Sequence, residues 1–400
     1  MRFQPDITNL AYSTKELKQC VRNTDFYNLG AVKSTLDDDI AAGAQSFYDG
    51  GLATGPLRRS EVRERNLYSP LGFIDTLCVR RTDQILRHAF KTNILNREHE
   101  VYQLLQILLS PAQLFVFKTD IQSFFESVKF SDVIKQIQDE GLRNSSVIKH
   151  LTSINQHLLS VHSYPGLPRG LALSSTLADY YLRSFDTIWL RRKSVVYYTR
   201  YVDDICIIHF DDHQQIKATV ENSLKSIGLD LNFRKTRHLP IEVPHHLDFL
   251  GYRISLGTPQ CVSIAPSKIS KTKKRIALSL KDYLKTNDFD LLAQRLKFLS
   301  TLCSLHKADR QKRVYSGIKI NYKHCTPVEI GKQLNELDSY LKGLLYSKRY
   351  TLSRSLRSRM SSAELAFLDK LSFTRSFDNH IVYSISQTRM SHIRKAWQYE

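Results

Sequence analysis

The sequence predicts an α+β fold, and three observations support this. Two runs of β-branched and aromatic residues, 195–200 (VVYYTR) and 205–210 (ICIIHF), flank a short turn and are typical of paired strands. Leucines recur at helical spacing in the last third of the chain. That third, from Val262 onward, holds 27 basic and 11 acidic residues, which is most of the net charge of +19. The chain therefore combines a nearly neutral body with a basic, helical region.

Composition narrows the classes of protein that fit. A length of 400 residues allows one large domain or two to three smaller ones. The basic C-terminal third predicts a surface for a polyanion, and nucleic acid is the usual candidate. The six cysteines show no CxxC pairing, so we expect reduced, mostly buried thiols. No apolar run resembles a signal peptide or a membrane span, which predicts a cytoplasmic protein with no membrane partner.

The turn between the two strands reads Tyr201-Val202-Asp203-Asp204. Adjacent carboxylates at the tip of a hairpin concentrate negative charge at one point, and a bound cation neutralises such charge. The alternative is a solvated turn, because Asp-Asp pairs are common in turns.

A second acid follows another apolar run. Residues 114–117 (LFVF) predict a buried strand, and Asp120 lies just beyond it. Taken alone, Asp120 would equally suit a helix or turn cap. If the two segments form neighbouring strands, Asp120, Asp203 and Asp204 converge. Three such carboxylates can hold two Mg²⁺ ions about 3.5–4 Å apart for an in-line displacement.

Five segments, in this order, resemble the palm motifs A to E of reverse transcriptases. They are residues 119–127 (TDIQSFFES), 165–175 (PGLPRGLALSS), 201–204 (YVDD), 228–236 (GLDLNFRKT) and 246–252 (HLDFLGY). The resemblance implies a right-hand polymerase with a ferredoxin-like palm, an antiparallel sheet plus helices. It divides the chain into an N-terminal extension (1–60), fingers (61–117), palm (118–261) and a helical basic thumb with the C-terminal region (262–400).

The resemblance also implies roles for individual residues. The metal ligands would be Asp120, Asp203, Asp204 and the backbone carbonyl of Ile121, holding two Mg²⁺ ions, with Mn²⁺ as a substitute. Lys235 in motif D would donate a proton to the departing pyrophosphate; on composition alone it is an ordinary surface lysine.

Nucleotide selection is expected from other positions. Phe125 lies where the family has a sugar-selecting aromatic, which predicts deoxynucleotide use; the alternative is a core aromatic. Motif B departs from the common Gln-Gly and reads Arg169-Gly170. The permanent charge of Arg169 could bind phosphate or read a base edge, which puts ordinary template copying in doubt; the alternative is a benign variant within the family.

The segments on either side of the palm are less distinctive. The resemblance implies that basic residues of the fingers hold the triphosphate. The candidates are Arg80, Arg81, Arg87, Lys91 and Arg97, with Lys91 and Arg97 taken as substrate-binding; the alternative for each is a solvated base. The Gly-rich stretch 50–55 lacks the ending of a P-loop and is expected to be a loop. Capping boxes are expected at Thr326 and Ser361, ahead of thumb helices. The thumb's basic segments are residues 267–275 and 348–359.

These observations lead to one principal hypothesis and two alternatives. The principal one is an RNA-directed DNA polymerase that adds dNTPs to a 3′-OH. The residues in these motifs most resemble those of bacterial retron, abortive-infection or defence-associated reverse transcriptases, which implies a role in anti-phage defence. Expected partners are template or noncoding RNA, the DNA product, and a partner protein or a second copy of the chain. The alternatives are a non-templated or protein-primed DNA nucleotidyltransferase and an inactive RNA-binding scaffold.

Overall fold

A computed structural model describes residues 12–22, 25–29, 31–48, 57–62, 64–91, 96–109, 112–142, 145–257, 259–305 and 314–397. The chain divides into two compact units. The first comprises residues 1–100 and 111–240, and the second comprises residues 101–110 and 241–400. The four parts expected from sequence are finer than these two units and remain a prediction.

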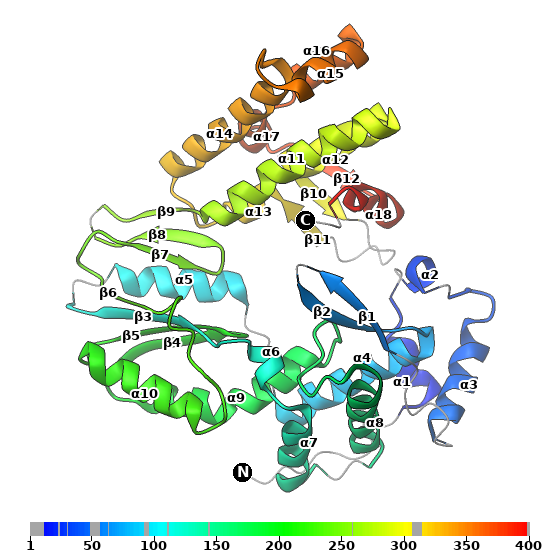
Figure 1. Ribbon diagram of the computed structural model, residues 1–400, viewed down its shortest axis with the longest axis vertical. Helices are drawn as coiled ribbons and strands as arrows, with labels where there is room; N and C mark the ends of the chain where they lie inside the picture. The colour runs from blue at the N-terminus through cyan, green and yellow to red at the C-terminus, as the bar shows by residue number, and fades with distance from the viewer. Residues whose placement is uncertain are drawn as a thin grey trace. The chain divides into compact units, whose positions relative to one another are not determined.

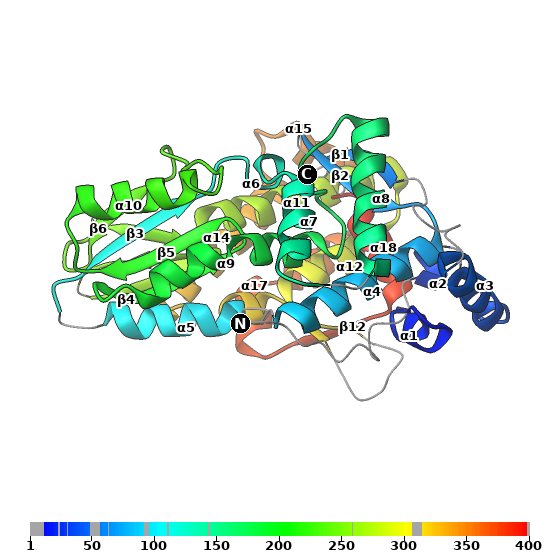
Figure 2. The ribbon, with the colours of Figure 1, turned by 90° about the horizontal axis from the view of Figure 1, so that it is seen from below.

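The first unit is built on a four-stranded antiparallel sheet in the order β4-β5-β3-β6. Its strands are β3 (Phe115–Asp120), β4 (Val195–Tyr201), β5 (Asp204–His209) and β6 (Arg237–Pro240). Helices α9 (Ser174–Arg191) and α10 (His213–Lys225) cover one face of the sheet (Figures 1 and 2). Alternation along the strands places Phe117, Ile205 and Ile207 on this face, where they join the main core of the unit.

The rest of the first unit is mostly helical. It comprises α1 (Thr14–Gln19), α2 (Asp25–Asn28), α3 (Leu36–Tyr48), α4 (Phe73–Phe90), the start of α5 (Arg97–Leu108), α6 (Phe124–Ser127), α7 (Phe130–Asp139) and α8 (Ser145–His162). A separate hairpin of β1 (Leu57–Val62) and β2 (Arg65–Pro70) packs on α4 and α8. Several of these helices share the core with α9, so the loops that follow β3 and precede α9 have a fixed support.

The second unit contains a three-stranded antiparallel sheet followed by helices. The sheet is β7 (His246–Phe249), β8 (Tyr252–Ser255) and β9 (Cys261–Ile264). The helices are α11 (Pro266–Thr286), α12 (Phe289–Ser300), α13 (Ile318–Asn321), α14 (Pro327–Tyr346), α15 (Thr351–Arg359), α16 (Ser362–Lys370), α17 (Phe373–Asp378) and α18 (Gln387–Lys395). The long helices α11 and α14 pack together (Figure 1).

Some local expectations are confirmed and others are wrong. The Ser361 capping box is present, with Glu364 closing it. The Thr326 box is absent: Pro327 begins α14 as expected, but the Thr326 hydroxyl donates to the carbonyl of Val262 instead. The last third also holds a small mixed sheet that the helical pattern did not indicate, formed by β10 (Leu302–Leu305), β11 (Val314–Gly317) and β12 (Val382–Ile385). The Gly-rich stretch 50–55 lies outside the described residues.

Two compositional expectations can also be compared with the structure. All six cysteines are free thiols, and Cys20, Cys78, Cys206 and Cys303 are buried, as expected. Among the described helices, none is both long enough and apolar enough to cross a membrane.

Candidate active site

The candidate site lies at one end of the sheet in the first unit. Strands β4 and β5 pair from Val195 to Tyr201, with Tyr201 opposite Asp204, so Val202 and Asp203 form a two-residue hairpin loop. Val202 has a φ of 61°, an unusual value for a β-branched residue. Tight two-residue hairpins require a positive φ at the first loop position, because only then does the turn match the twist of the strands.

The register of the sheet brings the separate acids together. Asp120 is the last residue of β3 and lies directly opposite Asp204 of β5. The Ile121 amide donates to the Asp203 carbonyl at 3.1 Å, which ties the chain after β3 to the turn. The motif D segment is joined to the same place, because the Asn232 amide donates to the Asp120 carbonyl at 2.9 Å. Three of the segments singled out in the sequence therefore meet at one sheet end.

Two lysines balance part of this negative charge. Lys118 lies 3.1 Å from Asp204, two residues along the same face of β3. Lys235 contacts the Oδ2 atom of Asp120 and remains about half exposed. Burial raises the pKa of Asp204 to about 6, against the lowering effect of Lys118 and with Asp120 and Asp203 adding to the rise. Burial, and then the charge of Asp120, also raise the pKa of Asp203.

The three aspartates provide the kind of ligand atoms that a hard divalent cation prefers. The carboxylates of Asp120, Asp203 and Asp204 are oxygen donors gathered in one partly buried place. Burial is the main cause of the raised pKa values of Asp203 and Asp204, and the charges of the neighbouring acids add to it. Within the described residues, however, no three acidic, histidine or cysteine side chains lie close enough to hold a metal ion by themselves. Mg²⁺ commonly takes one or two carboxylates and completes its shell with water and substrate phosphates, which matches such a set.

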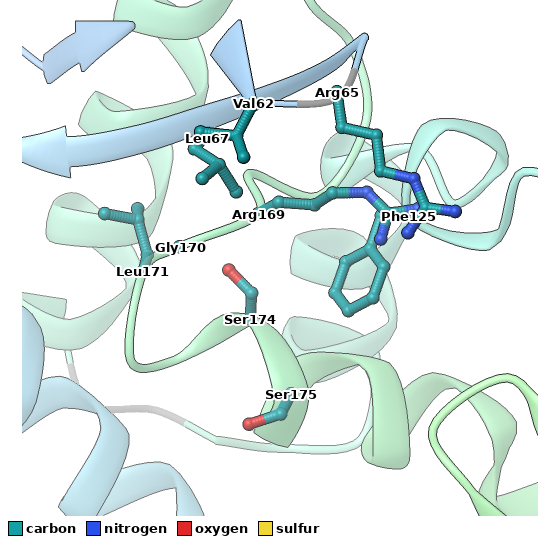
Figure 3. A pocket seen from close by; sticks show the side chains of 9 residues that line it. All are labelled: Val62, Arg65, Leu67, Phe125, Arg169, Gly170, Leu171, Ser174 and Ser175. Atoms are coloured by element: carbon teal, nitrogen blue, oxygen red, sulfur yellow. The ribbon is translucent and has the colours of Figure 1, made fainter. Parts of the chain in front are cut away.

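A cavity of about 580 Å³ lies in the first unit, beside Phe125 and the loop before α9. It is lined by Val62, Arg65, Leu67, Phe125, Arg169, Gly170, Leu171, Ser174 and Ser175. Figure 3 shows Arg65 and Arg169 reaching toward the same side of this cavity, next to the Phe125 ring. Two guanidinium groups beside an aromatic ring suit a ligand that carries both negative charge and a flat or apolar part.

Arg169 is held by neighbours in motif A. Its Nε and Nη2 atoms each donate to a carboxylate oxygen of Glu126 at 3.0 Å. Its guanidinium lies over the Phe125 ring, 4.5 Å from the centroid. Burial acts to raise the pKa of the Glu126 carboxyl. Hydrogen bonds from Arg169 outweigh this effect and hold the pKa below its ordinary value. Arg169 thus covers Phe125 in this structure, a contact that the sequence did not indicate.

Gly170 is required by its surroundings. Its φ is 99°, and a Cβ at this position would lie 2.6 Å from the carbonyl oxygen of Tyr68. The backbone meets β2 here, because the Tyr68 amide donates to the Arg169 carbonyl at 2.7 Å. Only glycine allows this approach.

The expected fingers residues do not line this cavity. Lys91 ends α4 in a left-handed conformation, and Arg97 begins α5 beside Glu98. The three remaining candidates each pair with an acid, and the pairs are Arg80 with Asp25, Arg81 with Glu16 and Arg87 with Asp83. These three arginines form ion pairs within the first unit. The basic side chain that the fingers region contributes to the cavity is Arg65.

Several residues of the site were not identified from sequence. Arg65, Glu126, Lys118 and Arg200 all contact it or its supports. Glu126 carries the clearest signal in retrospect, since it adjoins Phe125 and has a charge opposite to that of Arg169. The others depend on strand register and on the β1–β2 hairpin, which the sequence pattern did not predict.

Comparisons with known proteins bear on the region that contains these motifs. Residues 80–254 match the family model described as reverse transcriptase (RNA-dependent DNA polymerase). Comparison with curated proteins found no match. Among solved structures, an apo telomerase from Candida tropicalis, truncated from its C-terminal domain, is similar at 16% identity with a TM-score of 0.39. The match covers 53% of this chain and 55% of the telomerase chain, so the present chain spans about half the length of that relative. The chain has a right-hand polymerase fold, and residues 80–254 are similar to the reverse transcriptase family.

Proposed function

We propose that this protein is an RNA-directed DNA polymerase that adds dNTPs to a 3′-OH. One observation carries the proposal: Asp120 lies directly opposite Asp204 in the sheet, next to the hairpin loop that holds Asp203. This arrangement lies inside the stretch that matches the reverse transcriptase model. The remaining roles follow from the neighbours of these acids.

The acids serve as the site for two divalent cations. Asp120 and Asp203 are the principal ligands, with the Ile121 carbonyl as a further donor; Asp204, paired with Lys118, contributes less directly. Bound Mg²⁺ or Mn²⁺ would activate the primer oxygen and offset charge on the leaving pyrophosphate. Lys235 neutralises Asp120 in this structure. Its exposed ammonium can turn from the carboxylate and donate a proton to the leaving group.

The cavity beside Phe125 takes the incoming nucleotide. Arg65 and Arg169 supply positive charge for phosphates, and Phe125 supplies the flat surface against which a 2′-OH would clash. The charge of Arg169 reaches the acids as well, since it acts to lower the pKa of Asp203. Lys91 and Arg97, expected from sequence to bind substrate, do not line this cavity.

The biological setting belongs to the same proposal. The motif sequences resemble those of stand-alone bacterial retron, abortive-infection and defence-associated enzymes. We therefore assign the protein to anti-phage defence in the cytoplasm. The basic helices α11 and α15 supply the charge that a template RNA, a noncoding RNA or a product duplex requires. A partner protein or a second copy of the chain completes the assembly.

A second candidate function rests on Arg169. Its contacts with Glu126 and Phe125 fix a guanidinium group at the side of the cavity. The reverse transcriptase motif B that this segment resembles commonly has glutamine at that position. A fixed guanidinium there suits synthesis without a template, on a nucleic-acid or protein primer, and so favours the non-templated or protein-primed nucleotidyltransferase.

The decisive experiment replaces a charged carboxylate with a neutral amide of nearly the same size and shape. Asp203→Asn should lower nucleotide incorporation by at least about 100-fold, because the acid no longer neutralises a cation. The matched control is Asp211→Asn, since Asp211 lies beyond the opposite end of the same hairpin and pairs with Arg192. Incorporation by Asp203→Asn at the level of the control would contradict the proposal.

Sequencing the product separates the two candidate functions. Purified wild-type protein with its co-purifying RNA should make DNA complementary to that RNA. A homopolymer or simple repeat with no counterpart in the RNA would instead establish the non-templated activity.

A further inference from the structure

The hairpin loop that carries Asp203 has an unfavourable backbone and needs outside support. Val202, at a φ of 61°, is β-branched, and such residues rarely adopt the left-handed region unless the surroundings hold them there. Support from one side is already evident, because the Ile121 amide donates to the Asp203 carbonyl. The carbonyl of Val202, one residue earlier, has a different partner.

That partner is the side chain of Arg200. Its Nη1 atom donates to the Val202 carbonyl at 2.8 Å. Arg200 lies opposite Ile205 in the β4–β5 pairing, so its side chain points to the sheet face covered by α9, away from Asp204. The guanidinium therefore reaches the turn from the α9 side of the sheet. It does not cover the opposite face, on which Asp204 lies.

Arg200 is itself fixed by acids on α9. Its Nε and Nη2 atoms donate to the two oxygens of Asp186 at 2.8 and 2.7 Å, and Nη1 donates to Asp179 at 3.1 Å. The Tyr198 hydroxyl donates to Asp186 at 2.5 Å. The arginine side chain is only 5% exposed. A buried, bidentate guanidinium with charged partners has little conformational freedom. The position of α9 therefore determines where the guanidinium holds the turn.

We infer that Arg200 is a positioning residue for the catalytic turn: held by Asp186 and Asp179, it fixes the Val202 carbonyl and thereby the placement of the Asp203 carboxylate. The inference rests on the proposed function for its catalytic consequence, although the mechanical part stands on the contacts alone. A single hydrogen bond to the backbone next to Asp203 matters because catalytic geometry tolerates little displacement.

The test uses Arg200→Lys in the full-length protein. Lysine keeps the charge, but one ammonium cannot reach Asp186, Asp179 and the Val202 carbonyl together. Amide hydrogen exchange should become faster in the peptide spanning 201–204, measured without metal or nucleotide. In steady-state assays kcat should fall about 100-fold, as expected for a misplaced catalytic group. The KM for dNTP should change by less than about twofold, since the nucleotide cavity is untouched.

The matched control is Arg192→Lys. Arg192 also pairs with an acid, with its Nε and Nη2 atoms both contacting Oδ2 of Asp211, but it lies at the opposite end of the β4–β5 hairpin. It should leave exchange at 201–204 and kcat unchanged. Asp186→Asn provides a second variant if Arg200→Lys does not fold; it should shift both readouts in the same direction.

Each outcome decides the question. Unchanged exchange at 201–204 in a folded Arg200→Lys or Asp186→Asn protein would overturn the inference, whatever happens to kcat. An equal fall in kcat for Arg192→Lys would overturn it as well, because the effect would then be general destabilisation. Absence of incorporation by wild-type protein would count against the proposed polymerase activity, while the exchange measurement would still decide whether Arg200 holds the turn.

Discussion

At the residue scale, one wall of the cavity proposed for the nucleotide depends on three side chains in contact. Glu126 orients Arg169, and Arg169 lies over the face of Phe125. The Phe125 backbone is fixed as well, because its carbonyl accepts from the Leu167 amide at 2.8 Å. The position of the ring is therefore defined, as its proposed role in discriminating between sugars requires.

Phe125→Ala should admit ribonucleotides. Removing the ring removes the surface that excludes a 2′-OH, so the ratio of kcat/KM for dNTP to that for rNTP should fall by about tenfold or more. Arg169→Gln should give an intermediate loss, since the ring stays but is no longer covered. The measurement is single-nucleotide extension with matched dNTP and rNTP. An unchanged ratio in Phe125→Ala would remove the sugar-selecting role.

The acids and the aromatic could be predicted from the sequence because each lies in a short, contiguous motif. Asp120, Asp203 and Phe125 are recognised by their immediate neighbours along the chain. Glu126 and Arg200 could not be assigned roles in this way, because their partners lie tens of residues away or depend on which strand face they occupy. The pairing of Lys118 with Asp204 likewise requires the register of β3 against β5.

At the element scale, a buried polar chain joins three helical segments of the first unit. The Tyr12 hydroxyl, just before α1, lies 2.7 Å from the Thr82 hydroxyl on α4. Thr82 lies 2.7 Å from Nδ1 of His150 on α8. Burial lowers the pKa of His150 to about 4, so the imidazole is neutral in the folded protein at pH 7.

This histidine makes the first unit sensitive to acid. Its pKa is lower in the folded chain than the value of about 6.5 in the unfolded chain, so the unfolded state binds the proton first. The stability that His150 contributes is complete above pH 6.5 and is lost as the pH falls toward 4. Between pH 7 and pH 5 the loss should be about 2 kcal/mol.

Urea unfolding at pH 7 and pH 5 measures this loss. His150→Phe keeps the ring volume, and Thr82 keeps its bond to the Cys78 carbonyl, so the variant should fold. Its free energy of unfolding should fall less between the two pH values than that of the wild-type protein. Identical falls would show that other groups, such as the buried His209, account for the acid sensitivity.

Element prediction succeeded where local patterns decide structure. The β4–β5 hairpin and the Ser361 cap follow from strand propensity and capping chemistry. The pattern missed β10, β11 and β12, three short strands of which β12 pairs with β10 from a distant part of the chain. It also missed the β1–β2 hairpin, which is rich in charged residues and has only one fully buried position on each strand.

At the scale of the whole molecule, charge is distributed unevenly along the chain. The second unit contains most of the net charge of +19, with helix α15 bearing Arg354, Arg357 and Arg359 and no acid. Basic side chains on a helix release counterions when they meet a phosphate backbone, so binding should weaken as salt rises.

Replacing Arg354 and Arg357 together with glutamine should weaken nucleic-acid binding in a salt-dependent way. The slope of log K against log salt concentration should become shallower by about 1 to 2 units, one for each lost phosphate contact. Fluorescence anisotropy with a primed RNA–DNA duplex at several salt concentrations gives the slope. Lys225→Gln is the control, because Lys225 is exposed on α10 and already paired with Glu221. An unchanged slope in the double variant would exclude α15 from the interface.

The close approach of Gly170 to Tyr68 has a mechanical consequence. Because the Tyr68 amide bonds to the Arg169 carbonyl and no side chain separates the two backbones, we expect a shift of the β1–β2 hairpin to be passed to the loop before α9. A displacement of Arg65 at the hairpin tip therefore also shifts Arg169, which reaches toward the same side of the cavity. The same loop is bonded to Phe125, because the Leu167 amide donates to the Phe125 carbonyl. If the cavity takes the nucleotide as proposed, substitutions in the hairpin should alter which nucleotide is accepted without contacting it.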